Sequence, residues 1–282
     1  MNSSLLAALV GTVAGLHAAT WGMYKDAPHE GFSARKYLRS PILGGIIGVL
    51  VHASSGLDPR NPATLIVLFG MIYAVERAVA EIYKTFLREE DQSKYFIPMQ
   101  LHVLGRVVQS RTARLLAGFV YTALLLGLVL AIRHLDVSGA GNDLGWTALV
   151  IGSLGGWISA FGGTWKDAPS EGFQLFKFFR SPLLALLFAF GLSYLTDSLL
   201  ATMLAATGFT VATTETYKTF FFPSKPRGKF AGRPVVFPEI LTWRRRFVPL
   251  YVAIWIALAG SLTVALVAAH SGATLVGELS HE

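Results

Sequence analysis

Two pairs of carboxylates in this sequence are spaced so that they can converge on one ligand. Asp and Glu stand four residues apart in two places, Asp26 with Glu30 and Asp167 with Glu171. Converging carboxylate oxygens are the ligands that Mg²⁺ prefers, so these residues are candidates for a divalent metal site. The alternative is that they form salt bridges with the Lys and Arg of the same segments, because the spacing matches no established metal motif.

Cations and hydroxyls accompany each carboxylate pair. A Lys directly precedes each Asp, and each segment ends in Arg-Ser-Pro. Ser is a strong N-cap and Pro is favoured at the first helical position, so helices are predicted to begin at Ser40 and Ser181. Free N–H groups at a helix N-terminus attract anions, and a neighbouring Arg adds a bidentate donor. The predicted anion-binding residues are Lys25, Arg39, Ser40, Lys166, Arg180 and Ser181. The alternative is two ordinary capped helices.

Charged residues inside apolar segments form a third group of candidates. A charged side chain within a membrane is costly, so such a residue is by default a functional candidate. In two apolar segments a Glu precedes a Lys by three residues, which places both on one side of a helix. The predicted coupling or gating residues are Glu76, Arg77, Glu81, Lys84, Glu215 and Lys218. The alternative is a set of structural ion pairs, with Lys25 or Arg39 as further partners.

These candidates belong to an internal repeat. Residues 25–41 and 166–182 are identical at 11 of 17 positions, at a constant offset of 141 and without a gap. A second repeat relates residues 81–86 to residues 215–220. The copies differ near this second match, since Glu76 and Arg77 correspond to Thr210 and Val211. A repeat of this kind indicates a duplicated unit, here residues 1–140 and residues 141–282.

Composition places the duplicated unit in a membrane. The chain has 282 residues, of which 53% are hydrophobic and only 15% are charged. It has no Cys, which excludes disulfides, thiolate metal sites and Cys nucleophiles. No catalytic triad, zinc motif or dinucleotide fingerprint is present. The net charge of +7 comes from basic residues between apolar segments, so we expect a membrane partner and no nucleic acid.

The apolar segments predict an all-α integral membrane protein with about eight transmembrane helices. A spanning helix needs roughly 20 apolar residues. The predicted spans are residues 5–23, 41–57, 62–83, 115–132, 145–163, 182–196, 198–219 and 247–270. Four spans per copy give both copies the same orientation, so we expect two parallel four-helix repeats related by a pseudo-two-fold axis.

Charge predicts the orientation of the bundle. Four segments on one side, residues 24–40, 84–114, 164–181 and 218–246, contain 21 of the 24 Lys and Arg residues. By the positive-inside rule these segments are cytoplasmic and both termini lie outside. The second and sixth spans are short, and paired short spans often mark a binding site in repeat transporters. Small residues in 152–156 predict close helix packing.

The sequence therefore predicts a transporter or channel-like membrane protein. We expect it to bind an anionic or phosphate-bearing solute, or a lipid headgroup, at a cytoplasm-facing site formed by both copies of the repeated segment. One alternative is a membrane enzyme that acts on a lipid phosphate with Mg²⁺. Another is a non-catalytic membrane subunit or scaffold. No cofactor other than Mg²⁺ is expected, and the expected partners are the bilayer, anionic lipid headgroups and a homo-oligomer or larger membrane complex.

Overall fold

The computed structural model of this chain describes residues 2–138, 144–223 and 228–279, and its fold is all-α. The long helices are α1 (Ser3–Glu30), α2 (Ala34–Ser55), α3 (Pro62–Ile82), α4 (Arg111–Ser138), α5 (Leu144–Glu171), α6 (Leu175–Leu192), α7 (Leu199–Phe220) and α9 (Val248–Leu279). The shorter elements are the π-helix η1 (Tyr83–Leu87), the strands β1 (His102–Val103) and β2 (Arg106–Val107), the 3₁₀-helix η2 (Gly228–Phe230), α8 (Pro238–Trp243) and the 3₁₀-helix η3 (Arg244–Phe247).

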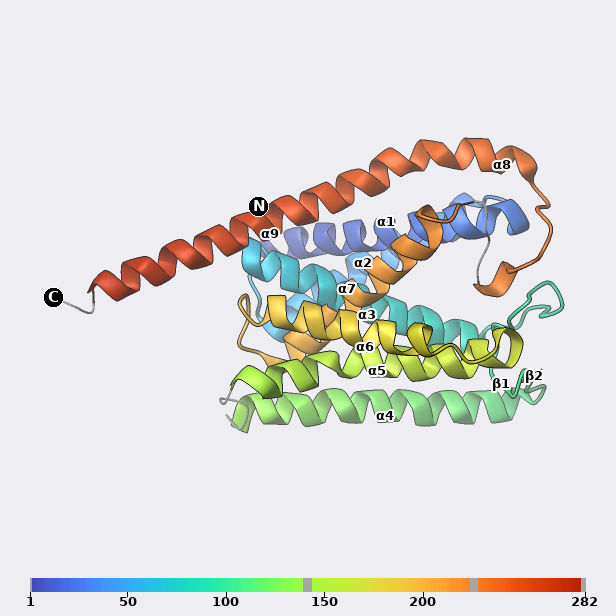
Figure 1. Cartoon of the computed structure of the whole chain (residues 1–282), viewed down its shortest axis with the longest axis horizontal. Helices are drawn as coiled ribbons and strands as arrows, with labels where there is room; N and C mark the ends of the chain where they lie inside the picture. The colour runs from blue at the N-terminus through green and yellow to red at the C-terminus, as the bar shows by residue number, and fades with distance from the viewer. Residues whose placement is uncertain (1, 139–143, 224–227, 280–282) are drawn as a thin grey trace.

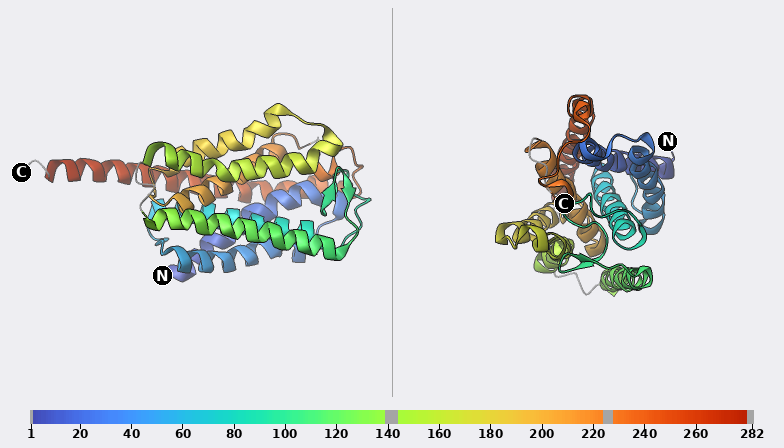
Figure 2. Two further views of the ribbon diagram at one scale, coloured as in Figure 1. Left: turned by 90° about the horizontal axis from the view of Figure 1, so that it is seen from below. Right: turned by 90° about the vertical axis from the view of Figure 1, so that its right-hand side faces the viewer.

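The long helices run side by side along one axis (Figure 1). The start of α1 and the end of α9 lie at one end of the bundle, and α9 projects beyond it (Figures 1 and 2). The β1–β2 hairpin and α8 lie at the opposite end. The segments 83–110 and 228–247 therefore gather at the end remote from both termini, together with the two turns after α1 and α5.

Six helical segments of the described chain are long and apolar enough to cross a membrane. They are Ser3–Glu30, Ala34–Ser55, Pro62–Leu87, Arg111–Ser138, Leu175–Leu192 and Pro238–Ala268. The other two long helices, α5 and α7, are not among them. Helix α7 packs against α3, α5 and α6, and a helix enclosed by other helices can carry polar residues that a lipid-facing helix cannot. It accordingly contains six Thr residues between 207 and 219.

The core lies where α3 and α7 cross at the centre of the bundle. A Cβ atom on Gly208 would come within 2.0 Å of the carbonyl oxygen of Gly70, so these backbones can touch only because both residues lack a side chain. Phe69 and Phe209 stack beside this contact with ring centroids 5.8 Å apart. One hydrophobic cluster contains buried residues from both halves of the chain. The predicted boundary at residues 140 and 141 lies outside the described residues.

The helices α3 and α7 begin and end close to the predicted positions. Asn61 caps α3, its side chain accepting a hydrogen bond from the N–H of Ala63, and Pro62 occupies the first turn. Ser198 caps α7 in the same way through the N–H of Ala201. The predicted boundaries of 62–83 and 198–219 are confirmed within a residue at each end.

The predicted starts of the second and sixth helices are wrong. Helix α1 continues through Pro28 to Glu30, and α2 begins at Ala34 after its N-cap Ser33. Ser40 and Pro41 therefore lie inside α2, and Ser181 and Pro182 lie inside α6. A Pro within a helix removes one backbone hydrogen bond but does not forbid the helix when packing holds it. The RSP tripeptides consequently offer no free helix N-terminus to an anion.

Glycine ends the first helix of each copy. Gly31 has φ 76° and Gly172 has φ 77°, a left-handed region that residues with a Cβ rarely adopt. Both residues turn the chain immediately into the next helix. Because α2 and α6 start before the RSP tripeptide, they contain 22 and 18 residues. At 1.5 Å per residue α2 is about 33 Å long, so the prediction of a short second span is wrong, whereas α6, at about 27 Å, is the shortest of the long helices.

Candidate functional site

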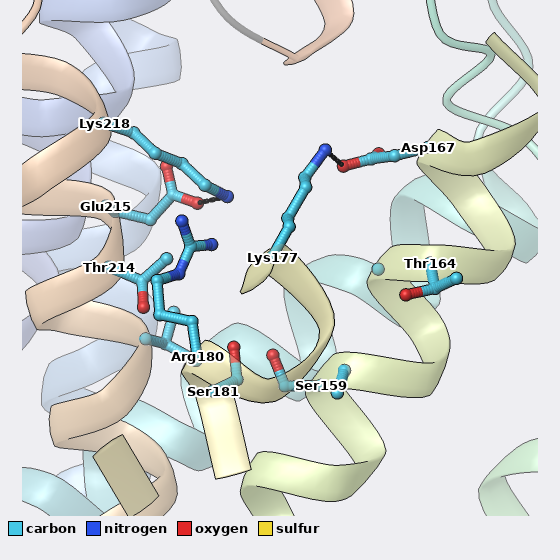
Figure 3. A pocket seen from close by; sticks show the side chains of 12 residues that line it. Ser159, Thr164, Asp167, Lys177, Arg180, Ser181, Thr214, Glu215 and Lys218 are labelled. Atoms are coloured by element: carbon cyan, nitrogen blue, oxygen red, sulfur yellow. Dashed lines mark hydrogen bonds and ion pairs between the residues drawn. The ribbon is translucent and has the colours of Figure 1, made fainter. Parts of the chain in front are cut away.

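A polar cavity lies between α5, α6 and α7 at the end of the bundle remote from the termini (Figure 3). Its volume is about 100 Å³, which is enough for several water molecules or one small anion. Charged and hydroxyl side chains of three helices line it. The polar lining residues are Ser159, Thr164, Asp167, Lys177, Arg180, Ser181, Thr214, Glu215 and Lys218.

Cations outnumber carboxylates in this lining. The Nζ of Lys177 lies 2.7 Å from Asp167 and 2.6 Å from Glu171, so this one ammonium bridges both carboxylates of the second carboxylate pair. Lys218 pairs with Glu215 at 3.3 Å. Arg180 adds a third cation, and Figure 3 shows its guanidinium beside Glu215 and Lys218. Three cations against two lining carboxylates leave the cavity with a net positive charge.

Two buried hydroxyl groups complete the cavity wall. Ser181 and Thr214 are 6% and 7% exposed, and both line the cavity. The Oγ1 of Thr214 has no hydrogen-bond partner among the described residues. A buried hydroxyl without a partner costs free energy, and an oxyanion or a water molecule in the cavity would supply the missing acceptor. The wall therefore combines charge and hydroxyl donors, which is the chemistry that binds phosphate or carboxylate.

Glycines on α5 bring α6 and α7 close enough to form this cavity. A Cβ on Gly156 would lie 2.6 Å from the carbonyl oxygen of Ser181, and a Cβ on Gly155 would lie 1.6 Å from the hydroxyl of Thr207. The predicted close packing of residues 152–156 is confirmed. It also explains why Ser181, well inside α6, faces the cavity from short range.

The Lys that begins each copy of the repeated segment pairs with a Glu from the other half of the chain. Lys25 on α1 lies 3.0 Å from Glu215 on α7, and Lys166 on α5 lies 3.5 Å from Glu81 on α3. Lys84 pairs with Glu81 one helical turn away. These two reciprocal ion pairs are called the crossed pairs below. Each of the predicted gating residues Glu81 and Glu215 therefore forms one ion pair with a Lys of its own half and one with a Lys of the other half.

Glu76 and Arg77 form a separate pair deeper in the bundle. Glu76 is 1% exposed and accepts a hydrogen bond of 2.6 Å from the Nη2 of Arg77. The guanidinium of Arg77 also lies 5.5 Å from the ring centroid of Trp21, within cation–π range. The two buried charges thus satisfy each other. A coupling role for this pair stays a prediction.

The first copy of the repeated segment is covered by distant parts of the chain. Lys229 lies 3.0 Å from both Asp26 and Glu30, and the hydroxyl of Tyr95 donates to Glu30 at 3.2 Å. The backbone N–H of Phe237 donates to the carbonyl of Pro28. Met23 and Ala27 pack against Ile240 of α8 with Trp243 and Phe247 beside them.

The predicted cations of the first copy do not gather around a cavity. Arg39 is exposed on α2, whereas its counterpart Arg180 lines the polar cavity. Ser40 is buried against α1, where a Cβ on Gly15 would lie 2.1 Å from its carbonyl oxygen. The structure therefore places the six predicted anion-binding residues in different surroundings. Only Arg180 and Ser181 line the polar cavity.

The pKa values of two side chains in the segment 83–110, Tyr95 and Glu90, are shifted in opposite directions. Burial, and then the nearby carboxylate of Glu30, raise the pKa of Tyr95 above its ordinary value. Burial would raise the pKa of Glu90, but hydrogen bonds from Lys94 and Tyr95 and the charge of Arg88 outweigh it and lower that pKa. At neutral pH Tyr95 is therefore a neutral donor and Glu90 an ionised acceptor.

Each predicted metal site holds an ammonium group between its carboxylates. Lys229 lies between Asp26 and Glu30, and Lys177 occupies the same place in the second copy. Within the described residues, no three His, Cys, Asp or Glu side chains cluster in a way that can hold a metal ion. This arrangement matches the salt-bridge alternative stated above. Binding of Mg²⁺ stays a prediction.

Sequence reasoning missed three residues that shape these sites. Lys177 had a usable signal, because it is identical to Lys36 in the repeat alignment. In both copies this Lys pairs with the Glu of its own segment, at 3.4 Å for Lys36 and Glu30. Lys229 and Thr214 had no comparable signal, since they come from distant parts of the chain that only folding brings near.

Comparisons of the chain with protein-family models, with curated proteins and with solved structures found no match. The two copies of the repeated segment, and the different contacts that each makes, are therefore the features from which a function can be inferred.

Proposed function

We propose that this protein is an integral membrane protein, transporter or channel-like, that binds a small anion in the polar cavity between α5, α6 and α7. The anion is a phosphate or carboxylate group of a solute or of a lipid headgroup. The observation that carries the proposal is the lining of the cavity: three cations with the buried hydroxyls of Ser181 and Thr214. The unsatisfied Oγ1 of Thr214 points to a ligand that completes the wall.

The proposed membrane arrangement has eight spans, of which six are apolar enough to cross a membrane by themselves and α5 and α7 are the other two. The two halves run parallel, with the same orientation in each. The basic segments lie on the cytoplasmic side and both termini lie outside. Support comes from the positive-inside rule and from the position of both chain ends at one end of the bundle (Figure 1). The polar cavity then opens near the cytoplasmic face.

The site differs from the one that the sequence predicts. The sequence predicts a single site shared by both copies of the repeated segment, whereas the proposed cavity belongs to the second copy. The crossed pairs connect it to the first half, because Glu215 lines the cavity and also binds Lys25. An anion that attracts Lys218 or Arg180 competes with Glu215 for the same cations. Ligand binding is in this way coupled to the contact between the halves.

Neutralising Arg180 tests the proposal. The full-length protein is purified in detergent, and its melting temperature is measured with rising concentrations of inorganic phosphate. We expect phosphate to stabilise the wild type and R180Q to lose that stabilisation, since binding to the folded state raises the melting temperature by mass action. The matched variant is R39Q, the same residue of the exposed first copy, for which the stabilisation should persist.

The outcomes separate the possible sites. Loss of stabilisation in R39Q as well as R180Q would support the shared site that the sequence predicts. Stabilisation that neither variant changes would contradict anion binding at the repeated segments. Replacing inorganic phosphate by short-chain phosphatidic acid distinguishes a free anion from a lipid headgroup, because only the second also presents acyl chains.

A non-catalytic membrane subunit is the second candidate function. The observation in its favour is the first copy of the repeated segment, whose carboxylates are held by Lys229, Lys36 and Tyr95. Such a closed ionic cluster orders the end of the bundle without a ligand. This candidate predicts normal assembly and no response of the melting temperature to any small anion.

A further inference from the structure

A second, apolar groove runs between α7 and α9 and is separate from the polar cavity. Its volume is about 370 Å³. Its lining includes Phe220 at the end of α7, the next residue Phe221, and Val248, Val252, Trp255 and Ala259 of α9. From Val248 to Ala259 the groove extends about 17 Å along α9, at 1.5 Å per residue. A groove of this length and volume suits one extended hydrocarbon chain.

The floor of the groove presents no free polar group. The hydroxyl of Tyr251 is hydrogen-bonded to that of Thr216 at 2.6 Å, and the indole N–H of Trp255 donates to the same Thr216 oxygen at 3.3 Å. These are the polar side chains of the lining, and they satisfy one another. A polar ligand would therefore find no partner in the floor, whereas an apolar chain loses nothing by lying on it.

The rim of the groove faces the lipid. Val252 and Ile256 are 46% and 66% exposed, and further along α9 Val264 and Val267 are also exposed. Helix α9 belongs to one of the apolar spans, so this exposed surface lies against hydrocarbon rather than water. The molecules available to fill the groove are consequently lipids.

A cation lies three residues before the first residue of α9 that lines the groove. Arg245 lies in η3, one 3₁₀ turn before Val248, and continues the stripe that Val248, Val252 and Ala259 form at helical spacing. Arg245 is exposed and has no ion-pair partner among the described residues. Its neighbour Arg244 is already bound to the carbonyls of Tyr24 and Pro223. Arg245 is thus available to a group outside the protein.

We propose that the groove between α7 and α9 binds one acyl chain of an anionic glycerophospholipid, whose phosphate is bound by Arg245. The headgroup then lies at the level of η3, at the end of the bundle with the basic segments. The apolar groove suits the acyl chain of such a lipid, and the guanidinium of Arg245 suits its phosphate. A zwitterionic lipid has no net negative charge and is therefore attracted less strongly to Arg245. This lipid is a resident of the outer face of the bundle and does not enter the polar cavity.

Native mass spectrometry of the full-length protein in detergent tests the lipid site. Bound lipid is counted after addition of phosphatidylglycerol or phosphatidylcholine of the same chain length. We expect the wild type to retain phosphatidylglycerol preferentially. R245Q should lower the affinity for phosphatidylglycerol about tenfold and leave phosphatidylcholine unchanged, since it removes only the charged contact. R106Q, an exposed Arg in β2, is the matched charge control and should behave as the wild type.

A second pair of variants tests the channel. Ala259→Phe projects a ring into the groove, and Ala257→Phe adds the same ring to an exposed position of α9 that does not line it. We expect A259F to reduce retention of both lipids and A257F to reduce neither. R180Q should leave lipid retention intact, which separates this site from the proposed anion cavity.

Two results would overturn the lipid site. Equal retention of the two lipids by the wild type would remove the role of the headgroup charge. Equal behaviour of A259F and A257F would show that the groove does not hold the chain.

Discussion

The two copies of the repeated segment carry the same charges in different surroundings. In the first copy Ala27 and Pro28 are buried beneath the segment 221–247. In the second copy the corresponding Pro169 is exposed, and so are Phe173 and Phe176. The β1–β2 hairpin reaches the start of this copy, where His102 stacks on Trp165. One sequence motif therefore forms a sealed ionic cluster in one half and an open cavity in the other.

Residues around the motif cause this difference. The first copy has Trp21 and Met23 on α1, and both are buried. The second copy has Gly162 and Thr164 at the corresponding positions of α5, and Thr164 lines the cavity. Large side chains fill the space in one half, and small or polar ones leave it open in the other. The repeated motif thus fixes the charges of each site, while the neighbouring residues decide whether a ligand can enter.

The largest expected effect comes from removing the cation that seals the first copy. K229M leaves the carboxylates of Asp26 and Glu30 without their bridging ammonium, and loss of one partner of a mostly buried pair costs about 3 kcal/mol. The matched variant K177M affects the second copy, where the side chain of Lys177 is 27% exposed against 12% for that of Lys229, so it should cost about 1 kcal/mol. Thermal unfolding in detergent measures both. Equal losses of unfolding free energy would show that burial of the bridging ammonium does not distinguish the two copies.

A somewhat smaller effect is expected where α5 meets α7. A Cβ on Gly155 would clash with the side chain of Thr207. The corresponding residue of α1, Ala14, has a Cβ and is fully buried. G155A should lower the free energy of unfolding by about 2 kcal/mol through overpacking. G162A is the control, because a Cβ there meets nothing within 4 Å and Ala favours the helix. A neutral G155A would mean that α5 and α7 can move apart.

A larger side chain at position 164 should fill the polar cavity of the second copy. T164M introduces the side chain that the first copy has at Met23, and we expect it to fill the space above Ser181. The affinity for inorganic phosphate should fall about tenfold, which corresponds to about 1.4 kcal/mol. Phosphate-dependent melting reports the loss, and the melting temperature without phosphate should stay close to that of the wild type. Unchanged phosphate binding in T164M would place the anion elsewhere.

The smallest expected effect is on the stability of the folded protein at acid pH. The pKa of Glu90 is lowered in the folded protein, so its contribution to stability is present above the unfolded pKa and is lost as pH falls through the folded value. Wild type should therefore lose stability more steeply than E90Q when the pH is lowered below about 4. Melting curves between pH 3 and about 6 give the two slopes. Parallel slopes would contradict a role for Glu90 in covering the first copy.

The sequence predicts the class of fold and much of its packing. Caps at Asn61 and Ser198 mark two helices because their flanking residues are unambiguous, and the glycines at 152–156 mark a close contact. The helices α1 and α5 are longer than predicted, because Pro28 and Pro169 look like breaks but lie inside helices whose packing outweighs one missing hydrogen bond. The open cavity and the covering Lys229 depend on tertiary contacts that no local pattern contains.

The crossed pairs have a consequence for the history of the chain. In a symmetric dimer, residue i of one subunit meets residue j of the other, and j meets i in return. Lys25 with Glu215 and Lys166 with Glu81 follow that rule inside a single polypeptide. These two contacts are thus reciprocal in the way that subunit contacts are. If the chain arose by the duplication that the repeat predicts, the lysine that begins the repeated segment of a half-length ancestor would have met this glutamate in a second copy of the ancestor.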